Sequence, residues 1–458
     1  MILYDAYGRE VDTGMLSEEQ AAPTMAGVRN IYSVMHPSVG LTPHRLSQIL
    51  QAAEIGDPYL YLELAEEMEE KDLHYLAVLG TRKNAVSQLD LVVRAASSAA
   101  EDQRAASIVR EMIVDGPFQL DSVMFDILDA VGKGFSATEI MWDRSGREWF
   151  PVELKWRDPR WFAFDWISGE QMLVRTLKGE TEGAPASVET RPRHFGGGVP
   201  GSTASGIGIQ PMTARLAPFK FIVHFAKAKA GLPVRGGLAR AAGWAYLFKN
   251  YVLKDWVTFT EVFGQPLRVG KYHPGASEQD KQALLQAVSN IGTDAAAIIP
   301  ESMLIEFTEA HQTGSAELYE HFCEYLDSQV SKAVLGQTLT TEMPRSGGGS
   351  RAAAQVHDAV RRDILNADAR RLAATLNRDL IRPVVDLNMG PQTRYPKIEL
   401  GLPDDSDVKV FAEIVAMLAD RGLRVSQKTI LDKLGIAQAD ANDAVLAPVV
   451  GARTGDTQ

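Results

Sequence analysis

Apolar residues recur at spacings of three and four through the middle of the chain, which predicts one long helix over residues 238–263. Gly236 and Gly237 come before this helix, and Gly264 and Pro266 come after it, so helix-breaking residues stand at both ends. At about 1.5 Å per residue, the helix would be roughly 39 Å long.

A second apolar stripe predicts another long helix over residues 315–335. The chain between the two helices reads as a compact unit of strands and one helix. A small unit inserted between two antiparallel helices has to lie at their far end. Its predicted elements are a strand at 267–271, a helix at 277–291 and strands at 295–299 and 303–308.

A third helix is predicted over residues 351–388, with a kink near Pro383. The fifteen residues that precede it, 336–350, have no apolar periodicity and contain three consecutive glycines. Loops of this length are uncommon inside compact domains and usually have a function. We therefore expect residues 337–350 to form a functional loop.

The remaining pattern predicts an α+β protein that is mostly helical, with its strands grouped in the first half. Residues 1–55 read as an arm, residues 178–211 as a flexible loop, and residues after 446 as disordered. Six acids give the predicted helix at 58–79 one acidic side, which is typical of a solvated face. Further helices are predicted at 42–53, 100–115, 120–132, 407–421 and 426–434, and strands at 88–95, 136–143, 149–156, 162–165, 172–176, 219–225 and 397–400; the six acids are Glu63, Glu66, Glu67, Glu69, Glu70 and Asp72.

Charge changes this picture in one place. The 458-residue chain has a net charge of -12, which argues against a surface that grips nucleic acid throughout. Residues 219–273 nevertheless hold nine Lys and Arg against two acids. A basic band therefore accompanies the predicted helix over 238–263.

Candidate chemistry is sparse. The single cysteine, Cys323, lies in a helical pattern as a small buried residue and excludes an intrachain disulfide. Nucleotide-binding, hydrolase and zinc-protease motifs are missing, and no apolar run reaches about 18 residues. Gly347–Ser350 could hold a phosphate, and Asp404, Asp405 and Asp407 a cation, but loop and helix-capping roles are favoured for both. We expect no catalytic residue, cofactor, metal or membrane span, and a soluble cytosolic protein.

The order of these elements resembles that of bacteriophage portal proteins, and most closely the Mu-like group. The blocks that carry the resemblance are RGGLARAAGWAYLFKNYVLKDWVTFTEVFGQPLRVGKY (235–272), the insert up to Thr308, and GSAELYEHFCEYLDSQVSKAVLGQTLT (314–340). The resemblance implies an N-terminal arm (1–55), a wing (56–230), a first stem helix (231–264), a clip (265–312), a second stem helix (313–336), a tunnel loop (337–350), a long kinked wing helix with a strand (351–400), a crown (401–446) and a tail (447–458).

What this resemblance implies is a ring of copies, typically a dodecamer, at one vertex of the capsid in the virion. Such a ring conducts double-stranded DNA, without sequence preference, during packaging and ejection. The implied partners are the terminase large subunit, the major capsid protein or a scaffold, and neck or adaptor proteins, with assembly in the host cytoplasm. The competing hypothesis is a structural ring or adaptor of the head–tail junction that never contacts DNA.

The resemblance also assigns candidate residues. Phe248, Trp256 and Phe259 are expected to pack inside the stem. Lys249 and Lys254 are expected to lie off that stripe as part of the basic band, facing either DNA or a neighbouring subunit. The tunnel loop is expected to meet DNA through Thr340, Thr341, Glu342 and Arg345, with Gly347, Gly348 and Gly349 as its hinge.

Overall fold

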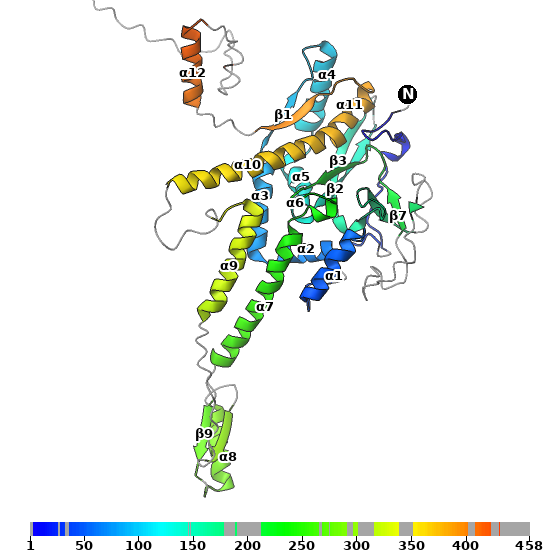
Figure 1. Ribbon diagram of the computed structural model, residues 1–458. Helices are drawn as coiled ribbons and strands as arrows, with labels where there is room; N and C mark the ends of the chain where they lie inside the picture. The colour runs from blue at the N-terminus through cyan, green and yellow to red at the C-terminus, as the bar shows by residue number, and fades with distance from the viewer. Residues whose placement is uncertain are drawn as a thin grey trace, which may run out of the picture. The chain divides into compact units, whose positions relative to one another are not determined.

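The computed structural model describes residues 3–25, 28–32, 36–177, 188–189, 212–264, 268–290, 296–300, 316–338, 351–401, 408–422 and 430, apart from 145, 147 and 274. The chain divides into two compact units, Met1–Leu400 and Gly401–Gln458. The first unit holds both sheets of the wing and the long helices (Figure 1). In the second unit the described helix is α12, Val408–Asp420.

Two antiparallel sheets form the core of the first unit. The strand β2, Phe135–Asp143, lies between β3, Phe150–Arg157, and β8, Phe221–Phe225. Ala137 of β2 stands opposite both Arg157 and Val223. The other sheet has the order β4 (Phe162–Phe164), β5 (Met172–Thr176), β7 (Met212–Arg215) and β6 (Val188–Glu189).

Aromatic rings join the two sheets. Phe135 meets Phe164 edge to face with centroids 5.0 Å apart, and Phe162 meets Phe221 in the same way at 6.1 Å. Such contacts contribute about 0.5–1.5 kcal/mol beyond the area that they bury. Strands β6 and β7 were not predicted, and β6 lies within the stretch expected to be a loop. The side chains of the described residues therefore close a core between the sheets.

The region predicted as one helix over 58–79 is two helices, α2 (Tyr59–Lys71) and α3 (Leu73–Ser87). Asp72 is extended between them, and its carboxylate accepts hydrogen bonds from the backbone N–H groups of His74 and Tyr75. An aspartate in this position caps a new helix and so interrupts the previous one. The other helices of this half are α1 (Pro43–Glu54), α4 (Ala100–Val109), α5 (Leu120–Ile127) and α6 (Ala130–Lys133).

The prediction of a solvated acidic face on this region is wrong. Glu63, Glu67 and Asp72 are buried, and Glu70 is the exposed member of the six acids. Buried carboxylates require cationic or hydrogen-bonding partners. Five of the acids meet a cation in the wing or the long helices: Glu63 with Arg160, Glu66 with Lys133, Glu67 with Lys71, Glu69 with Lys83, and Asp72 with Lys249.

The N-terminal arm lies on the wing sheets. Backbone N–H groups of Gln20 and Ala21 donate to the buried carboxylate of Glu139 in β2, at 2.6 and 3.1 Å. Arg29 donates to the backbone oxygen of Arg175 in β5. Strand β1, Asp90–Arg94, pairs with β11, Lys397–Gly401.

The helix predicted at 351–388 is interrupted as expected, but before its proline. Helix α10, Arg351–Leu376, passes into a π-helical turn, Asn377–Ile381, and then into α11, Arg382–Met389. Arg378 and Asp379 of this turn bond the backbone oxygen and N–H of Val223, at 2.7 and 2.9 Å. Buried His224 bonds Thr375 of α10, and burial lowers its pKa to about 4. These contacts hold the end of α10 against strand β8.

The insert predicted between the long helices contains β9 (Arg268–Tyr272), α8 (Glu278–Asn290) and β10 (Ala296–Pro300). β9 and β10 are parallel, with Ala296 opposite Arg268, and α8 provides the crossover that a parallel pair requires. Ser277 and Asp280 bond one another at the start of α8. The strand predicted at 303–308 lies outside the described residues.

Candidate functional site

The two long helices predicted from the apolar stripes are α7, Ala239–Gly264, and α9, Ala316–Leu335. Lys249 bonds Asp327, and seven residues further along α7 the ring of Trp256 stacks on Tyr319, with centroids 6.3 Å apart and planes 10° apart. Residue numbers rise along one helix as they fall along the other, so the helices are antiparallel (Figure 1). We call α7 and α9 the stem helices.

The start of α7 rests on a junction built of glycines. A Cβ atom at Gly237 would lie 2.4 Å from the oxygen of Gly132, the nitrogen of Gly134 and the carbonyl carbon of Lys133. A Cβ atom at Gly236 would lie 2.1 Å from the oxygen of Ala226. Two backbone segments can approach this closely only where no side chain stands between them. The glycine pair therefore seats the stem on the wing, besides starting the helix.

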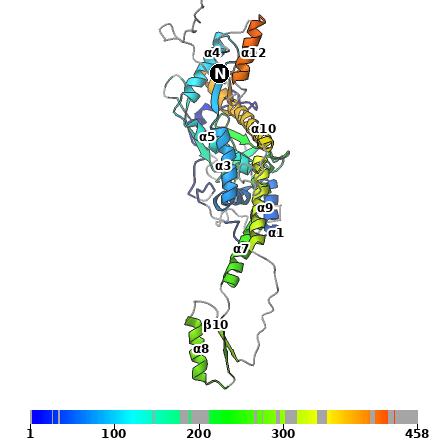
Figure 2. The same cartoon turned by 90° about the vertical axis from the view of Figure 1, so that its left-hand side faces the viewer.

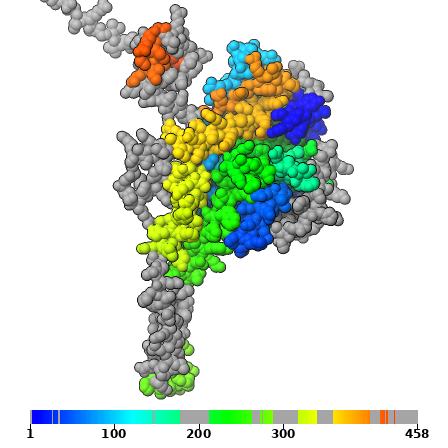
Figure 3. All heavy atoms as spheres, viewed as in Figure 1, coloured from blue at the N-terminus to red at the C-terminus, as the bar shows by residue number. Residues whose placement is uncertain are grey.

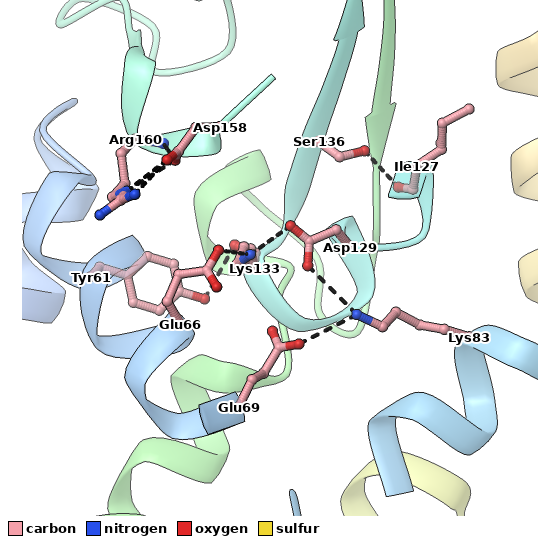
Figure 4. A network of polar contacts seen from close by, with 10 residues as sticks. All are labelled: Tyr61, Glu66, Glu69, Lys83, Ile127, Asp129, Lys133, Ser136, Asp158 and Arg160. Carbon is pink, nitrogen blue, oxygen red and sulfur yellow. Dashed lines mark hydrogen bonds and ion pairs between the residues drawn. The ribbon is translucent and has the colours of Figure 1, made fainter. Parts of the chain in front are cut away.

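A buried ionic network fixes the other side of this junction (Figure 4). The ammonium of Lys133 donates to Asp129 at 2.6 Å and to Glu66, while Lys83 lies 3.3 Å from Glu69 and 3.7 Å from Asp129. Burial would lower the pKa of Lys133, but the surrounding carboxylates, above all Asp129, outweigh burial and raise it. The Lys133 side chain is thus a buried cation.

The Lys133 backbone is held as well, because Tyr61 of α2 donates its hydroxyl to the Lys133 oxygen at 3.2 Å. Glu66 and Glu69 also belong to α2, whereas Lys83 belongs to α3 (Figure 4). Burial raises the pKa of Glu69. Helices α2 and α3 and the short helix α6 are joined in one network beside the start of α7.

Lys249 corrects the prediction of a basic band. Its ammonium bonds Asp72 at 2.9 Å and Asp327 at 2.6 Å, and its side chain is 16% exposed. Burial would lower the pKa of Lys249, but its bonds to Asp327 and Asp72 outweigh burial and raise it. Lys249 therefore joins α7, α3 and α9. Lys254 is exposed and has no ion pair among the described residues.

Other cations assigned to the band are also paired or buried. Arg235 and Arg240 contact Glu54 of α1, and Lys220 is fully buried, with its ammonium donating to the Leu16 oxygen at 2.6 Å. Burial lowers the pKa of Lys220 to about 8. Four of the nine cations of the band are therefore paired or buried within the chain, whereas Lys227, Lys229 and Lys254 are exposed.

Polar contacts also tie α3 to α9, which lie side by side (Figures 1 and 2). His74 bonds Ser331 at 2.7 Å. Arg82 bonds the Val334 oxygen and the Asp368 carboxylate of α10, each at 2.7 Å. Gly336 follows α9 with φ of 70°, and a Cβ atom there would meet Val360 and Ile364 of α10. The end of α9 is therefore fixed to α3 and α10 together.

The residues predicted to fill the stem core divide into two groups. Trp256 and Phe259 both meet Tyr319 of α9, at 6.3 and 5.7 Å between ring centroids, and are partly exposed. Phe248 is 40% exposed in the single chain, so the packing expected for it inside the stem is not made within one copy. Phe248 precedes Lys249, which faces α9, and successive residues of a helix turn by about 100°. Phe248 consequently points to the side of the helix pair.

The predicted tunnel-loop residues lie outside the described residues: Thr340, Thr341, Glu342, Arg345, Gly347, Gly348 and Gly349. Within the described part of the chain, no group of three or more His, Cys, Asp and Glu side chains is placed to hold a metal ion. No described helix has the length and hydropathy needed to cross a membrane. The expectations of no catalysis and no cofactor stay predictions.

Comparisons with known proteins identify the class. A family model described as "Portal protein of Mu bacteriophage" matches residues 62–436. The chain is 36% identical over 418 residues to the Mu-like prophage FluMu protein gp29 of Haemophilus influenzae, spanning 90% of this chain and 74% of that protein. It is 34% identical over 421 residues to the portal protein of Escherichia phage Mu, spanning 91% and 75%. The chain belongs to the family of Mu bacteriophage portal proteins.

The solved structures that resemble this chain include two at 11% sequence identity. One is the virion of a native gene transfer agent particle, with a TM-score of 0.44 over 87% of this chain and 95% of that chain. The other is the neck of a native gene transfer agent particle computed with C12 symmetry, with a TM-score of 0.46 over 82% and 94%. The family assignment rests on the sequence matches.

Proposed function

We propose that copies of this chain form a closed ring at one capsid vertex, through which double-stranded DNA enters and leaves the phage head. Membership of the Mu portal family supports this function, and portal proteins are virion components. The observation on this chain that carries the proposal is a set of large apolar side chains left exposed on the stem helices. Such residues form patches on monomers chiefly where another protein binds.

These side chains gather on one side of the helix pair. Phe322 and Tyr325 of α9 stack, with centroids 6.4 Å apart, and are 41% and 56% exposed. The surfaces of α7 (green) and α9 (yellow) lie next to one another in the space-filling view (Figure 3). We call this set the aromatic flank: Trp244, Phe248, Leu318, Phe322 and Tyr325. A second copy of the chain would cover it in a ring.

The same ring would place one loop from each subunit near its axis. Residues 337–350 are the proposed loop, with Arg345 as the side chain that reaches a phosphate, Thr340, Thr341 and Glu342 beside it, and Gly347, Gly348 and Gly349 as a hinge. Each phosphate that a protein neutralises adds salt-dependent affinity, which would slow DNA in transit. The pairing of Lys249 and Arg240 inside the chain fits a channel that conducts DNA without retaining it.

The proposed partners follow from the same architecture. The insert between the stem helices, 265–312, is the proposed clip that contacts the terminase large subunit and later the neck proteins. The wing, 56–230, is the proposed contact with the major capsid protein or scaffold. The terminase would supply the energy for packaging, and this chain the passage.

Replacing Phe322 and Tyr325 together by serine is expected to abolish rings at concentrations where the natural chain assembles, because each interface loses two aromatic side chains. The double variant should keep the unfolding midpoint of the natural chain, since both residues are exposed before assembly. Sedimentation velocity measures the oligomer, and thermal unfolding measures the fold.

The matched control is His321→Ser, which changes an exposed neighbour on the same helix outside the aromatic flank. This control should assemble normally. Rings of normal size from the Phe322/Tyr325 double variant would contradict the proposed role of the aromatic flank.

A further inference from the structure

The stem helices have a second exposed apolar surface on the opposite side. On α7, Val257 follows Trp256, which stacks on α9, whereas Phe248 precedes Lys249, which bonds α9. At about 100° per residue, a preceding and a following residue turn to opposite sides of the helix pair. Val257 is 57% exposed, and Leu253, four residues earlier on the same side, is 39% exposed.

The residues of α9 can be assigned to the same two sides of the helix pair as those of α7. Viewed along one direction, antiparallel helices wind in opposite senses, so residues that precede a facing residue on either helix point to the same side. Leu318 precedes Tyr319, which faces α7, and therefore shares a side with Phe248. This side is the aromatic flank, and Val257 lies opposite to it.

Helix α3 extends the opposite surface upward. Val330 lies about three turns from Tyr319 and on the same face of α9, so it also faces α7. Ser331 follows Val330 and therefore points to the side opposite the aromatic flank. Ser331 bonds His74 of α3. Helix α3 thus packs on the side of α9 away from the aromatic flank. Its Leu73 and Leu76 are 78% and 47% exposed. We call Leu73, Leu76, Leu253 and Val257 the aliphatic flank.

We propose that the aromatic flank of one copy packs on the aliphatic flank of the next copy. This proposal specifies the contact between neighbouring subunits and rests on the ring proposed above. Two different surfaces on opposite sides of one subunit make a head-to-tail contact, and such contacts close into rings when the rotation permits. A surface that bound its own counterpart would give a two-fold dimer instead.

Cyclic symmetry also sets which residues meet. A rotation about an axis along the stem keeps each residue at its height, so residues level with one another on the two flanks become neighbours. Trp256 and Tyr319 are level, which places Leu318 opposite Val257 of the next copy. Asp72 bonds Lys249, which places Phe248 opposite Leu73 of the next copy.

Charge agrees with this pairing. Asp255 precedes Trp256 and lies on the side of the aromatic flank, while Lys254 lies about 60° around α7 from Val257. Both are exposed, and neither has an ion pair among the described residues. They are adjacent in sequence and thus nearly level. In the proposed ring the carboxylate of Asp255 meets the ammonium of Lys254 from the next copy.

The test is oxidative crosslinking of full-length chains in a Cys323→Ser background. Leu318→Cys and Val257→Cys chains are mixed before assembly, and rings of each variant alone are the controls. Covalent dimers in the mixed rings, and none in rings of either variant alone, are expected. Because each chain in the mixture carries only one of the two introduced cysteines, they cannot form a disulfide within one chain. A covalent dimer therefore reports a contact between copies.

Each of the other outcomes would refute a specific part of the proposal. Rings that form without a crosslink in the mixture would refute the pairing and leave the ring itself intact. A crosslink in rings of Leu318→Cys alone would indicate a two-fold contact and refute the head-to-tail arrangement. Failure of the Cys323→Ser parent and the natural chain to form any ring would refute the proposed function as well.

Discussion

Replacing Gly237 by alanine is expected to lower the free energy of unfolding by about 3 kcal/mol, because the added methyl group overpacks a junction of backbone atoms. The new Cβ atom would lie 2.4 Å from backbone atoms of Gly132, Lys133 and Gly134. Those residues are held by the Lys133 network and can move only by disturbing it. Denaturant unfolding of the full chain measures the loss.

Gly243→Ala is the matched control, six residues further along and inside α7. A Cβ atom there would make ordinary contacts, 3.7 Å from Leu46 and 3.8 Å from Met68. Alanine is favoured over glycine within a helix by roughly 0.5–1 kcal/mol, so this variant should be neutral or slightly stabilised. If both variants lose the same stability, the glycine junction does not seat the stem as described.

Removing the Lys249 ammonium is expected to have a similarly large effect. Lys249→Ala leaves the carboxylates of Asp72 and Asp327 without their shared cation, and Asp72 is buried. Breaking a buried pair on one side typically costs about 3–5 kcal/mol. Because Asp327 is partly exposed, we expect a loss of about 3 kcal/mol, at the lower end of that range. The loss should appear in the free energy of unfolding of the unassembled chain.

Lys254→Ala provides the comparison, because this exposed lysine lies on the same helix and has no ion pair among the described residues. A surface substitution of this kind usually changes stability by less than about 0.5 kcal/mol. A Lys249→Ala variant as stable as Lys254→Ala would mean that the three-helix ion pair contributes nothing to the base of the stem.

The long helices were predictable because the residues that determine them lie within or next to each helix in the sequence. Apolar residues at helical spacing, with glycine and proline at the ends, predicted α7 and α9 almost residue for residue. The order of these helices and the insert between them also carried the resemblance to portal proteins. Local spacing, however, says only that a residue lies off the apolar stripe.

What an off-stripe residue contacts depends on distant parts of the chain. Lys249 and the acids of α2 looked solvated because charged residues usually are. Asp72 meets Lys249 from 177 residues away, and Glu66 meets Lys133 from 67 residues away. A one-dimensional charge pattern contains no record of such pairs, so the network at the base of the stem could not be predicted.

The glycine junction has only a partial signal in the sequence. Gly236 and Gly237 predict the start of a helix, and a helix does start after them. A second pair, Gly132 and Gly134, stands on either side of Lys133, and only the fold shows that the two pairs touch. Glycine pairs without a turn of their own to explain them indicate close backbone contact, but not with which partner.

We propose above that this chain assembles into a closed ring through its stem. Class averages of the purified full-length protein in negative-stain electron microscopy test it most directly. We expect closed rings of one subunit number, typically twelve in this family, with an opening on the axis. Monomers, two-fold dimers or open filaments under the same conditions would contradict it.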